Sequence, residues 1–133
     1  MKVLRWPLKM HHDERGGLIY PECPEITSKI KHFVVSISPP GAVRGNHYHK
    51  TRTEWISIIQ GKAELHLIDL NSQERASLLL NGGTPELVEI PPRVALVIKN
   101  VGEGEMIFLG FFDAPFDSQH PDDGTYQVLD IDK

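Results

Sequence analysis

The apolar residues of this chain occur in short bursts, and most of these bursts are separated by residues that turn the chain. The bursts read HFVVSIS, WISIIQ, KAELHLIDL, ASLLL, ELVEI, VALVIKN, MIFLGFF and YQVLDI, at residues 32–38, 55–60, 62–70, 76–80, 86–90, 94–100, 106–112 and 126–131. None is long enough to predict a helix, and several alternate with period two, as strands do. Between them lie SPPG, QG, NGG, PPR, GEG and PDDG, which supply the backbone geometry of tight turns. The pattern predicts an all-β fold, a double-sheet jelly-roll β-barrel.

A length of 133 residues fits one domain, and we expect it to cover residues 1–133 because no linker or repeat divides the chain. Lys and Arg number 14 against 18 Asp and Glu, with no basic run, so the composition argues against nucleic acid or a membrane surface as a partner. The single cysteine, Cys23, cannot form an internal disulfide. The N-terminal residues have the pattern of neither a signal peptide nor a membrane span. We therefore expect a cytoplasmic protein that binds a small molecule.

Two histidines and a glutamate make the strongest functional pattern, in GAVRGNHYHKTRTEWISIIQG at residues 41–61. His47 and His49 are two positions apart, so both side chains leave the same face of a strand. If Glu54 faces the interior together with Ile56 in the next strand, its carboxylate faces the two imidazoles. Two imidazoles and a carboxylate can hold a divalent metal, and an imidazole alone can act as an acid or a base. Strand geometry leaves both interpretations open.

The spacing of Gly41, His47, His49, Glu54 and Gly61 resembles the first motif of the cupin superfamily without a gap. This resemblance implies a jelly-roll barrel with the three polar side chains at its centre. It also implies that His47, His49 and Glu54 are candidate metal ligands, and that the two histidines are candidate catalytic residues.

The second cupin motif usually reads Pro-x-Gly-x-x-His-x-x-x-Asn, and PPRVALVIKN matches it at Pro91 and Asn100. Arg93 replaces the usual glycine, and Leu96 replaces the histidine that is the fourth metal ligand in most cupins. With three ligands left, we expect a divalent metal (Zn, Fe, Mn or Ni) to bind weakly or partially. We expect no organic cofactor.

Within the superfamily, VRGNHYHKTRTE and the segment from NVGEGEMIFLGFF to GTYQVLDI resemble the C-terminal cupin of bifunctional capsular-polysaccharide enzymes that epimerise and reduce UDP-linked keto-sugars. DERGGLI and the Arg-Gly-x-His core resemble, more loosely, dTDP-sugar 3,4-ketoisomerases and dTDP-4-dehydrorhamnose 3,5-epimerases. The resemblance implies an isomerase or epimerase of a nucleotide-linked keto-sugar in polysaccharide biosynthesis. We expect any activity to be that of the cupin itself or of a partner chain.

Two alternatives from other classes stay open: a non-catalytic metal- or sugar-binding cupin, and a metal-dependent oxygenase of the facial-triad type. For a nucleotide-sugar isomerase or epimerase, Arg44 is a candidate for binding the substrate pyrophosphate, because a guanidinium pairs with phosphate oxygens bidentately. Arg93 is a second candidate at the same mouth, and a surface position is the alternative for both. His32 has no partner at ligand spacing, so we expect it to be exposed.

Trp55 and Ile59 alternate with the inward residues of their strand and should project from its other side. Large apolar side chains of this kind need cover, either from a second layer of the chain or from another protomer. We expect a homodimer in which a second copy covers them.

Overall fold

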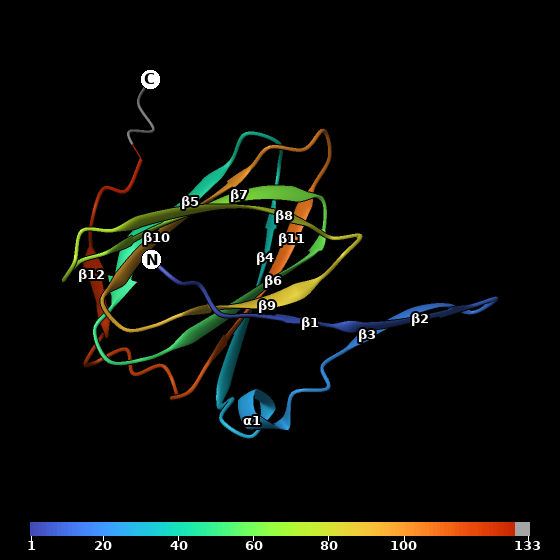
Figure 1. The fold of residues 1–133 in the computed structure, drawn as a ribbon, viewed down its shortest axis with the longest axis horizontal. Helices are drawn as coiled ribbons and strands as arrows, with labels where there is room; N and C mark the ends of the chain where they lie inside the picture. The colour runs from blue at the N-terminus through green and yellow to red at the C-terminus, as the bar shows by residue number, and fades with distance from the viewer. Residues whose placement is uncertain (130–133) are drawn as a thin grey trace.

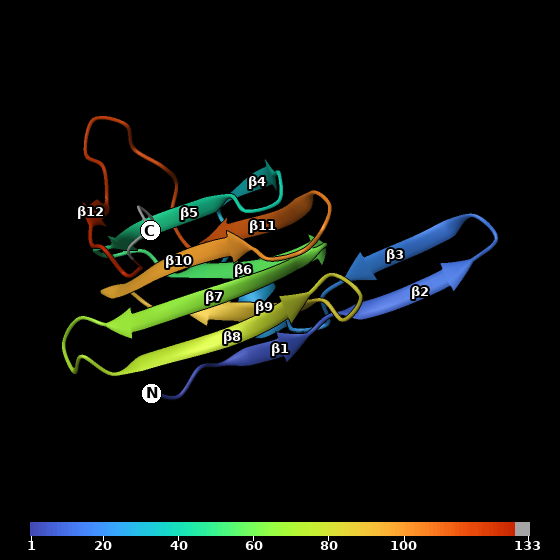
Figure 2. The ribbon, with the colours of Figure 1, turned by 90° about the horizontal axis from the view of Figure 1, so that it is seen from above.

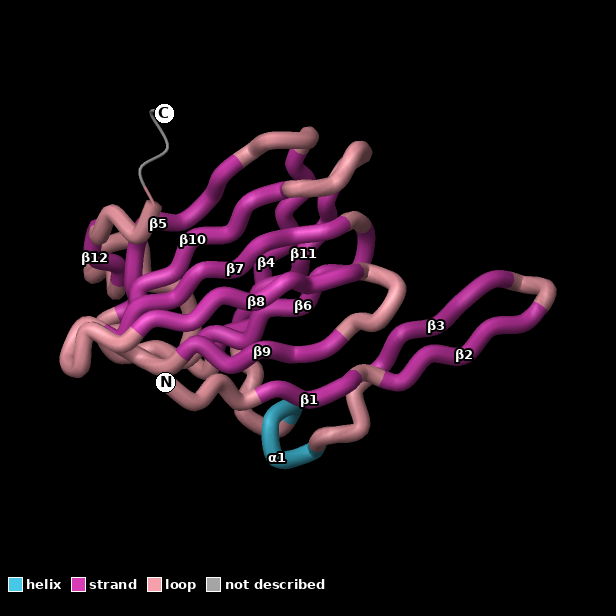
Figure 3. Tube along the Cα trace, turned by 45° about the horizontal axis from the view of Figure 1, so that its top comes forward, coloured by secondary structure: helices cyan, strands magenta, loops and turns pink. Residues whose placement is uncertain are grey.

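The structure is a computed structural model, and it describes residues 1–129. Two five-stranded sheets and a two-stranded hairpin contain all the described strands, and every strand pair is antiparallel. The first sheet runs in the order β1 (Arg5–Pro7), β9 (Glu86–Ile90), β6 (Glu54–Gln60), β11 (Met106–Phe112) and β4 (His32–Ser38). The second runs in the order β12 (Asp123–Thr125), β5 (Val43–His49), β10 (Val94–Asn100), β7 (Lys62–Asp69) and β8 (Arg75–Asn81). Figures 1 and 3 show the two sheets as facing layers.

Two further elements lie outside the sheets. The hairpin of β2 (Lys9–Asp13) and β3 (Gly16–Tyr20) projects away from the body of the molecule (Figure 2). A one-turn helix, α1 (Pro24–Thr27), follows it and begins with a proline, whose fixed φ suits the first helical position. No helix within residues 1–129 is long and apolar enough to cross a membrane.

Inward-facing aliphatic side chains from both sheets form the main core. On β7 the buried and half-buried residues alternate over most of the strand, which places Ala63, Leu65 and Leu67 inside. Ile56 and Ile58 of β6 join them from the opposite sheet. Full burial of a leucine or isoleucine side chain is worth about 1.5 to 3 kcal/mol, so this interleaved layer is the main force holding the sheets together.

The predicted all-β double-sheet fold is confirmed. Seven of the eight apolar bursts coincide with strands β4 and β6 to β11. The ends of each burst and its strand differ by no more than one residue. The last burst, at residues 126–131, contains no strand over residues 126–129, and its final two residues lie outside the described part. The sequence reasoning did not identify β1, β2, β3, β12 or α1, because these elements lack a long apolar repeat.

The outward side of β6 is covered by the chain itself. Trp55 is only 1% exposed and packs in a cluster with Ile26 of α1 and Leu87 of β9. Its indole Nε1 donates a hydrogen bond to Glu89 Oε1 at 3.1 Å. The expectation that a second protomer covers Trp55 is therefore wrong, because the N-terminal segment supplies the second layer. Ile59 is half-buried, and the homodimer itself stays a prediction.

A close approach of β5 and β10 shapes the wall on which the histidines lie. Gly45 has a φ of +111°, and a Cβ built there would lie 2.6 Å from the carbonyl oxygen of Leu96. The pairing register shifts at this point, between Leu96 and Val97. A side chain at position 45 would force the strands apart, so glycine is required for His47 to lie beside Leu96.

The side chain of Asn100 stabilises the turn between β10 and β11. Its amide Nδ2 donates to the carbonyl oxygens of Ser38 and Gly104, at 3.1 and 2.9 Å. Its Oδ1 accepts from the backbone N–H of Gly102 at 3.0 Å. The side chain is 1% exposed, so it satisfies three backbone groups in a place that excludes water.

We expect Asn100→Ala to lower the free energy of unfolding by about 3 kcal/mol, roughly one for each hydrogen bond lost. Asn81→Ala is the matched control, because the exposed side chain of Asn81 accepts one hydrogen bond, from the N–H of Gly83. Urea unfolding of both variants measures the difference. Equal losses in the two proteins would contradict a structural role for Asn100.

Candidate functional site

A cavity of about 760 Å³ lies between the two sheets. Strands β4, β5, β6, β10 and β11 supply most of its wall, and Asp123 of β12 closes one side. Most lining side chains are aliphatic or aromatic, and the polar ones include His47, His49, Arg52 and Glu54. An apolar pocket with a few convergent polar groups is the usual form of a small-molecule site.

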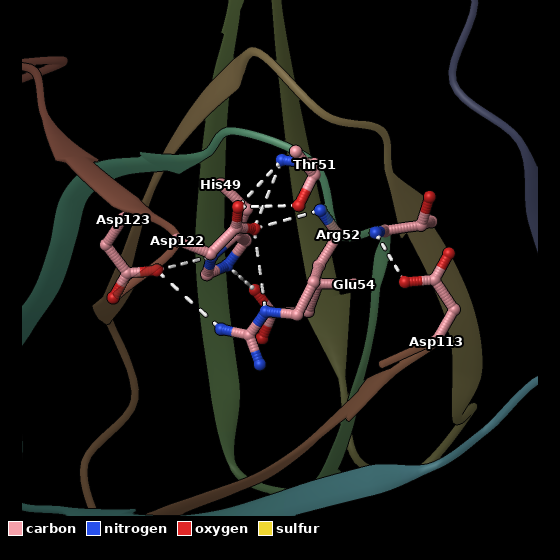
Figure 4. Close-up of polar contacts among 8 residues, drawn as sticks. His49, Thr51, Arg52, Glu54, Asp113, Asp122 and Asp123 are labelled. Carbon is pink, nitrogen blue, oxygen red and sulfur yellow. Dashed lines mark hydrogen bonds and ion pairs between the residues drawn. The ribbon is translucent and has the colours of Figure 1, made fainter. Parts of the chain in front are cut away.

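His49 is held between two carboxylates that come from two different strands. Its Nε2 lies 2.9 Å from Glu54 Oε1, and its Nδ1 lies 2.8 Å from Asp123 Oδ1 (Figure 4). His49 and Glu54 are only 3% and 4% exposed. A histidine that donates through both ring nitrogens is the imidazolium cation. The two carboxylates therefore hold the ring in position and favour its charged form.

The two histidines have pKa values shifted in opposite directions. Burial lowers the pKa of His49, but hydrogen bonds and charge attraction from Glu54 and Asp123 outweigh burial and raise it above the ordinary value. Burial and the neighbouring charge of His49 lower the pKa of His47, against weaker opposing effects of the same carboxylates. The ring centroids are 5.3 Å apart. His47 therefore favours the neutral form and its neighbour His49 favours the charged form.

Glu54 fits beside the opposite strand because position 110 has no side chain. A Cβ built on Gly110 of β11 would lie 2.5 Å from Glu54 Oε2, which is closer than real Cβ contacts come. Gly110 pairs with Ile56 of β6, so any larger residue would push the carboxylate out of line with His49.

The connection between β5 and β6 is tied to the segment before β12. The carboxylate of Asp122 accepts hydrogen bonds from Thr51 Oγ1 at 2.7 Å and from the backbone N–H groups of Thr51 and Arg52. Burial raises the pKa of Asp122, but these hydrogen bonds and the charge of Arg52 outweigh it and lower the pKa overall. Figure 4 shows Asp122, Asp123 and Arg52 gathered around His49.

The structure brings together the three residues of the predicted central site, because His47, His49 and Glu54 all line the cavity. Arg44 also lines it, with an exposed side chain at the start of β5. Arg93 does not line it. Its guanidinium lies 5.7 Å from the Tyr48 ring, in a turn where its φ of +64° explains why glycine is usual in the motif.

Leu96 faces the interior as the motif alignment predicts, and it is 3% exposed beside His47. Within residues 1–129, no group of three or more His, Cys, Asp or Glu side chains is arranged to hold a metal ion. Both nitrogens of His49 are engaged by carboxylates, so this ring offers no lone pair to a metal in the arrangement described. The donor set fits a metal poorly unless His49 first loses a proton.

Sequence reasoning missed three residues that line the cavity. The sequence gives no signal for Asp123 or Arg52, because PDDG and HKTRTE do not have the spacing of a ligand motif. Only the folded structure shows that both residues line the cavity. His32 was expected to be exposed, but it is half-buried and packs beside Phe112 and Phe116 at centroid distances of 5.7 and 6.4 Å. Its position at the start of an apolar burst was the one available signal.

Residues 11–126 match the model of the polysaccharide biosynthesis C-terminal domain family. The chain belongs to this family. It is 28% identical over 117 residues to a UDP-2-acetamido-2,6-beta-L-arabino-hexul-4-ose reductase of Pseudomonas aeruginosa, covering 88% of this chain and 31% of that protein. It is 29% identical to the capsular polysaccharide assembling protein CapF of Staphylococcus aureus, with a TM-score of 0.71 over 92% of this chain and 35% of that one. This domain thus spans about a third of the length of either relative.

The cupin jelly-roll assignment is confirmed by a further structure. The dTDP-4-dehydrorhamnose 3,5-epimerase of Sulfolobus tokodaii superposes with a TM-score of 0.80 at 21% identity, covering 96% of this chain and 80% of that one. This domain is therefore a cupin-like polysaccharide biosynthesis C-terminal domain with the architecture of the sugar-nucleotide epimerases and isomerases.

We expect Asp123→Asn to destabilise the fold more in mild acid than in mild base. A raised pKa means that the His49 cation contributes its full stability below about pH 6.5, the ordinary histidine value, and loses it as pH rises through the higher folded value. Removing the Asp123 charge removes part of that contribution, so the loss should be larger at about pH 6 than at about pH 9. Urea unfolding at both pH values measures it.

Asp113→Asn is the matched control for that measurement. Its carboxylate accepts a hydrogen bond from the backbone N–H of Thr53 at 3.0 Å, and no hydrogen bond joins it to a histidine within residues 1–129. Its effect should depend little on pH over the same range. A pH-independent loss for Asp123→Asn would show that His49 is not the group whose charge Asp123 stabilises.

Proposed function

We propose that this domain isomerises or epimerises a nucleotide-linked keto-sugar by proton transfer, as a step of polysaccharide biosynthesis. The observation that carries the proposal is the pair of neighbouring histidines whose pKa values are shifted apart at the wall of one cavity. Two titratable groups that differ in this way are what acid–base chemistry near neutral pH requires.

His47 is the base in this proposal. Its lowered pKa keeps the ring neutral near pH 7, and its side chain makes no hydrogen bond to any residue in the described part of the chain. A ring nitrogen is thus available to a substrate in the cavity. His49 cannot take this role in the same arrangement, because both of its nitrogens already donate to carboxylates.

The proposed reaction consists of proton transfers alone. His47 removes the proton from the carbon next to the sugar carbonyl, and the electron pair of the broken C–H bond moves onto the carbonyl oxygen to form an enolate. In an epimerisation, a proton from the solvent is added to the opposite face of the same carbon, and His47 releases the abstracted proton to the solvent. In an isomerisation, the neighbouring hydroxyl gives its proton to the carbonyl oxygen, and the protonated His47 gives its proton, after exchange with solvent, to the former carbonyl carbon. His49 stays charged throughout, so it favours the neutral form of His47 before the reaction and attracts the enolate afterwards.

The relatives support a nucleotide-sugar substrate. One relative is a reductase of a UDP-linked sugar, and similar folds include an epimerase in complex with dTDP-4-keto-L-rhamnose and a sugar 3,4-ketoisomerase in complex with TDP. In this chain, exposed Arg44 at the cavity edge is the group we assign to the pyrophosphate, since a guanidinium binds two phosphate oxygens at once.

We expect the wild-type protein to exchange a carbon-bound hydrogen of a keto-sugar for deuterium from the solvent. UDP- and dTDP-linked 4-keto-6-deoxy-hexoses are the probes, and NMR follows the exchange. His47→Gln should reduce the rate by roughly a hundredfold to ten-thousandfold, the usual effect of losing a general base. His66→Gln is the control. His66 lies on β7, is hydrogen-bonded to Ser77 and does not line the cavity.

The pH profile gives a second readout of the same assignment. The exchange rate should fall in acid with an apparent pKa below about 6.5, because the pKa of His47 is lowered and only the neutral ring accepts a proton. Absence of exchange with every probe would refute the proposed function. Full exchange in folded His47→Gln would refute His47 as the base.

Metal binding at His47, His49 and Glu54 stays a prediction. Coordination must displace a proton from His49, so occupancy should be partial, exchangeable and greater at higher pH. Leu96→His should raise the affinity, because residue 96 faces the interior beside His47 and the new imidazole adds a ligand. Titration of the chelator-stripped wild type and Leu96→His proteins with Zn²⁺ measures the two affinities. If neither protein binds the ion, His47, His49 and Glu54 are not a metal site.

A further inference from the structure

Arg52 is a buried cation whose donors are mostly unused. The side chain lines the cavity at 6% exposure, and its Nε and Nη1 have no hydrogen-bond partner within residues 1–129. A buried guanidinium whose N–H groups lack hydrogen-bond partners loses several kcal/mol of solvation. Buried donors without partners are rare in residues with a purely structural role. They are expected in a residue whose donors bind a ligand.

The carboxylates near Arg52 hold its position without using up its donors. Nε lies 3.6 Å from Asp122 Oδ2, and Nη2 lies 3.7 Å from Asp123 Oδ1. Both distances exceed the usual 2.7 to 3.2 Å of an N–H···O hydrogen bond. These contacts are therefore ion pairs that place the guanidinium, and Nη1 takes no part in them.

Two aromatic rings fix the plane and the depth of the guanidinium. Its Cζ lies 4.3 Å from the centroid of Phe112 and 5.9 Å from that of Phe116. Phe112 also meets the His49 ring edge-on at 5.1 Å. One phenyl ring thus contacts both Arg52 and His49, so the two cations lie on the same side of the cavity.

The local charge decides which kind of group Arg52 can bind. Glu54, Asp122 and Asp123 bring three negative charges to this end of the cavity, while Arg52 and His49 bring at most two positive ones. A pyrophosphate placed here would add further negative charge to a region that already has an excess. A neutral carbonyl oxygen adds none, and it acquires charge only while the reaction proceeds.

We infer that Arg52 donates a hydrogen bond to the keto oxygen of the sugar and stabilises the enolate formed from it. This inference rests on the proposed function. It divides the work between two arginines: Arg44 at the exposed edge binds the nucleotide diphosphate, and Arg52 in the buried interior binds the oxygen whose charge develops. A preorganised donor in a water-poor site is the most effective stabiliser of such a charge.

The test compares Arg52→Met and Arg52→Lys with wild type in the deuterium-exchange assay. Arg52→Met should reduce the exchange rate by roughly a hundredfold to a thousandfold, as the loss of one oxyanion donor does. Arg52→Lys should be intermediate, because an ammonium keeps the charge without the planar fork. Binding of UDP or dTDP alone, measured by calorimetry, should change less than about threefold in either variant. Arg44→Met should show the reverse pattern, with weaker nucleotide binding.

Each outcome decides one point. If folded Arg52→Met exchanges at the wild-type rate, or loses nucleotide binding as Arg44→Met does, the inference is overturned and the proposed function stands. If wild type exchanges no hydrogen, the proposed function fails and this inference fails with it. If Arg52→Met does not fold, the folded Arg52→Lys variant and the Arg52 Nε–H resonance of wild type decide. That resonance should shift with a keto-sugar nucleotide and not with UDP or dTDP, and an equal shift with both overturns the inference.

Discussion

The site depends on one buried ion pair that joins the two sheets. His49 belongs to β5 in one sheet and Glu54 to β6 in the other, and their side chains meet at 2.9 Å where both are nearly water-free. Pairing compensates for the desolvation of two charges, but it seldom exceeds what a packed apolar pair would contribute. The pair is therefore better understood as a constraint on position. It fixes how the strands of opposite sheets lie relative to each other at the point where the cavity needs polar groups.

A second layer of contacts keeps that pair from relaxing. Asp123 on edge strand β12 holds the other nitrogen of His49, and its neighbour Asp122 holds the backbone of the connection that leads to Glu54. A strand of only three residues would be marginal alone. It is stabilised here because Asp123, together with Asp122 just before the strand, pairs with the buried cations of Arg52 and His49. The C-terminal segment thus completes a site whose central histidine, His49, lies 74 positions before Asp123.

The sequence alone was enough to predict most of the strands in the two large sheets, the two-sheet fold and the meeting of His47, His49 and Glu54, because each follows from periodicity or from local spacing. It was not enough to find Arg52 or Asp123. Their roles depend on a contact between segments 71 residues apart, which no local pattern encodes. The cover over the outer face of β6 was missed for the same reason, since α1 is too short to leave a helical signature. Local rules therefore located the centre of the site, and tertiary contacts decided its chemistry.

Leu96 connects the departure from the cupin metal motif to the acid–base interpretation. It pairs with His47 across β10 and β5, and it is buried in the wall of the cavity. A histidine at this position would add a ligand and a polar neighbour, whereas the leucine side chain removes water from around His47. Burial is the largest cause of the lowered pKa of His47, so the residue that removes a fourth ligand also favours a neutral imidazole. The same substitution that weakens the case for a metal therefore strengthens the case for a base.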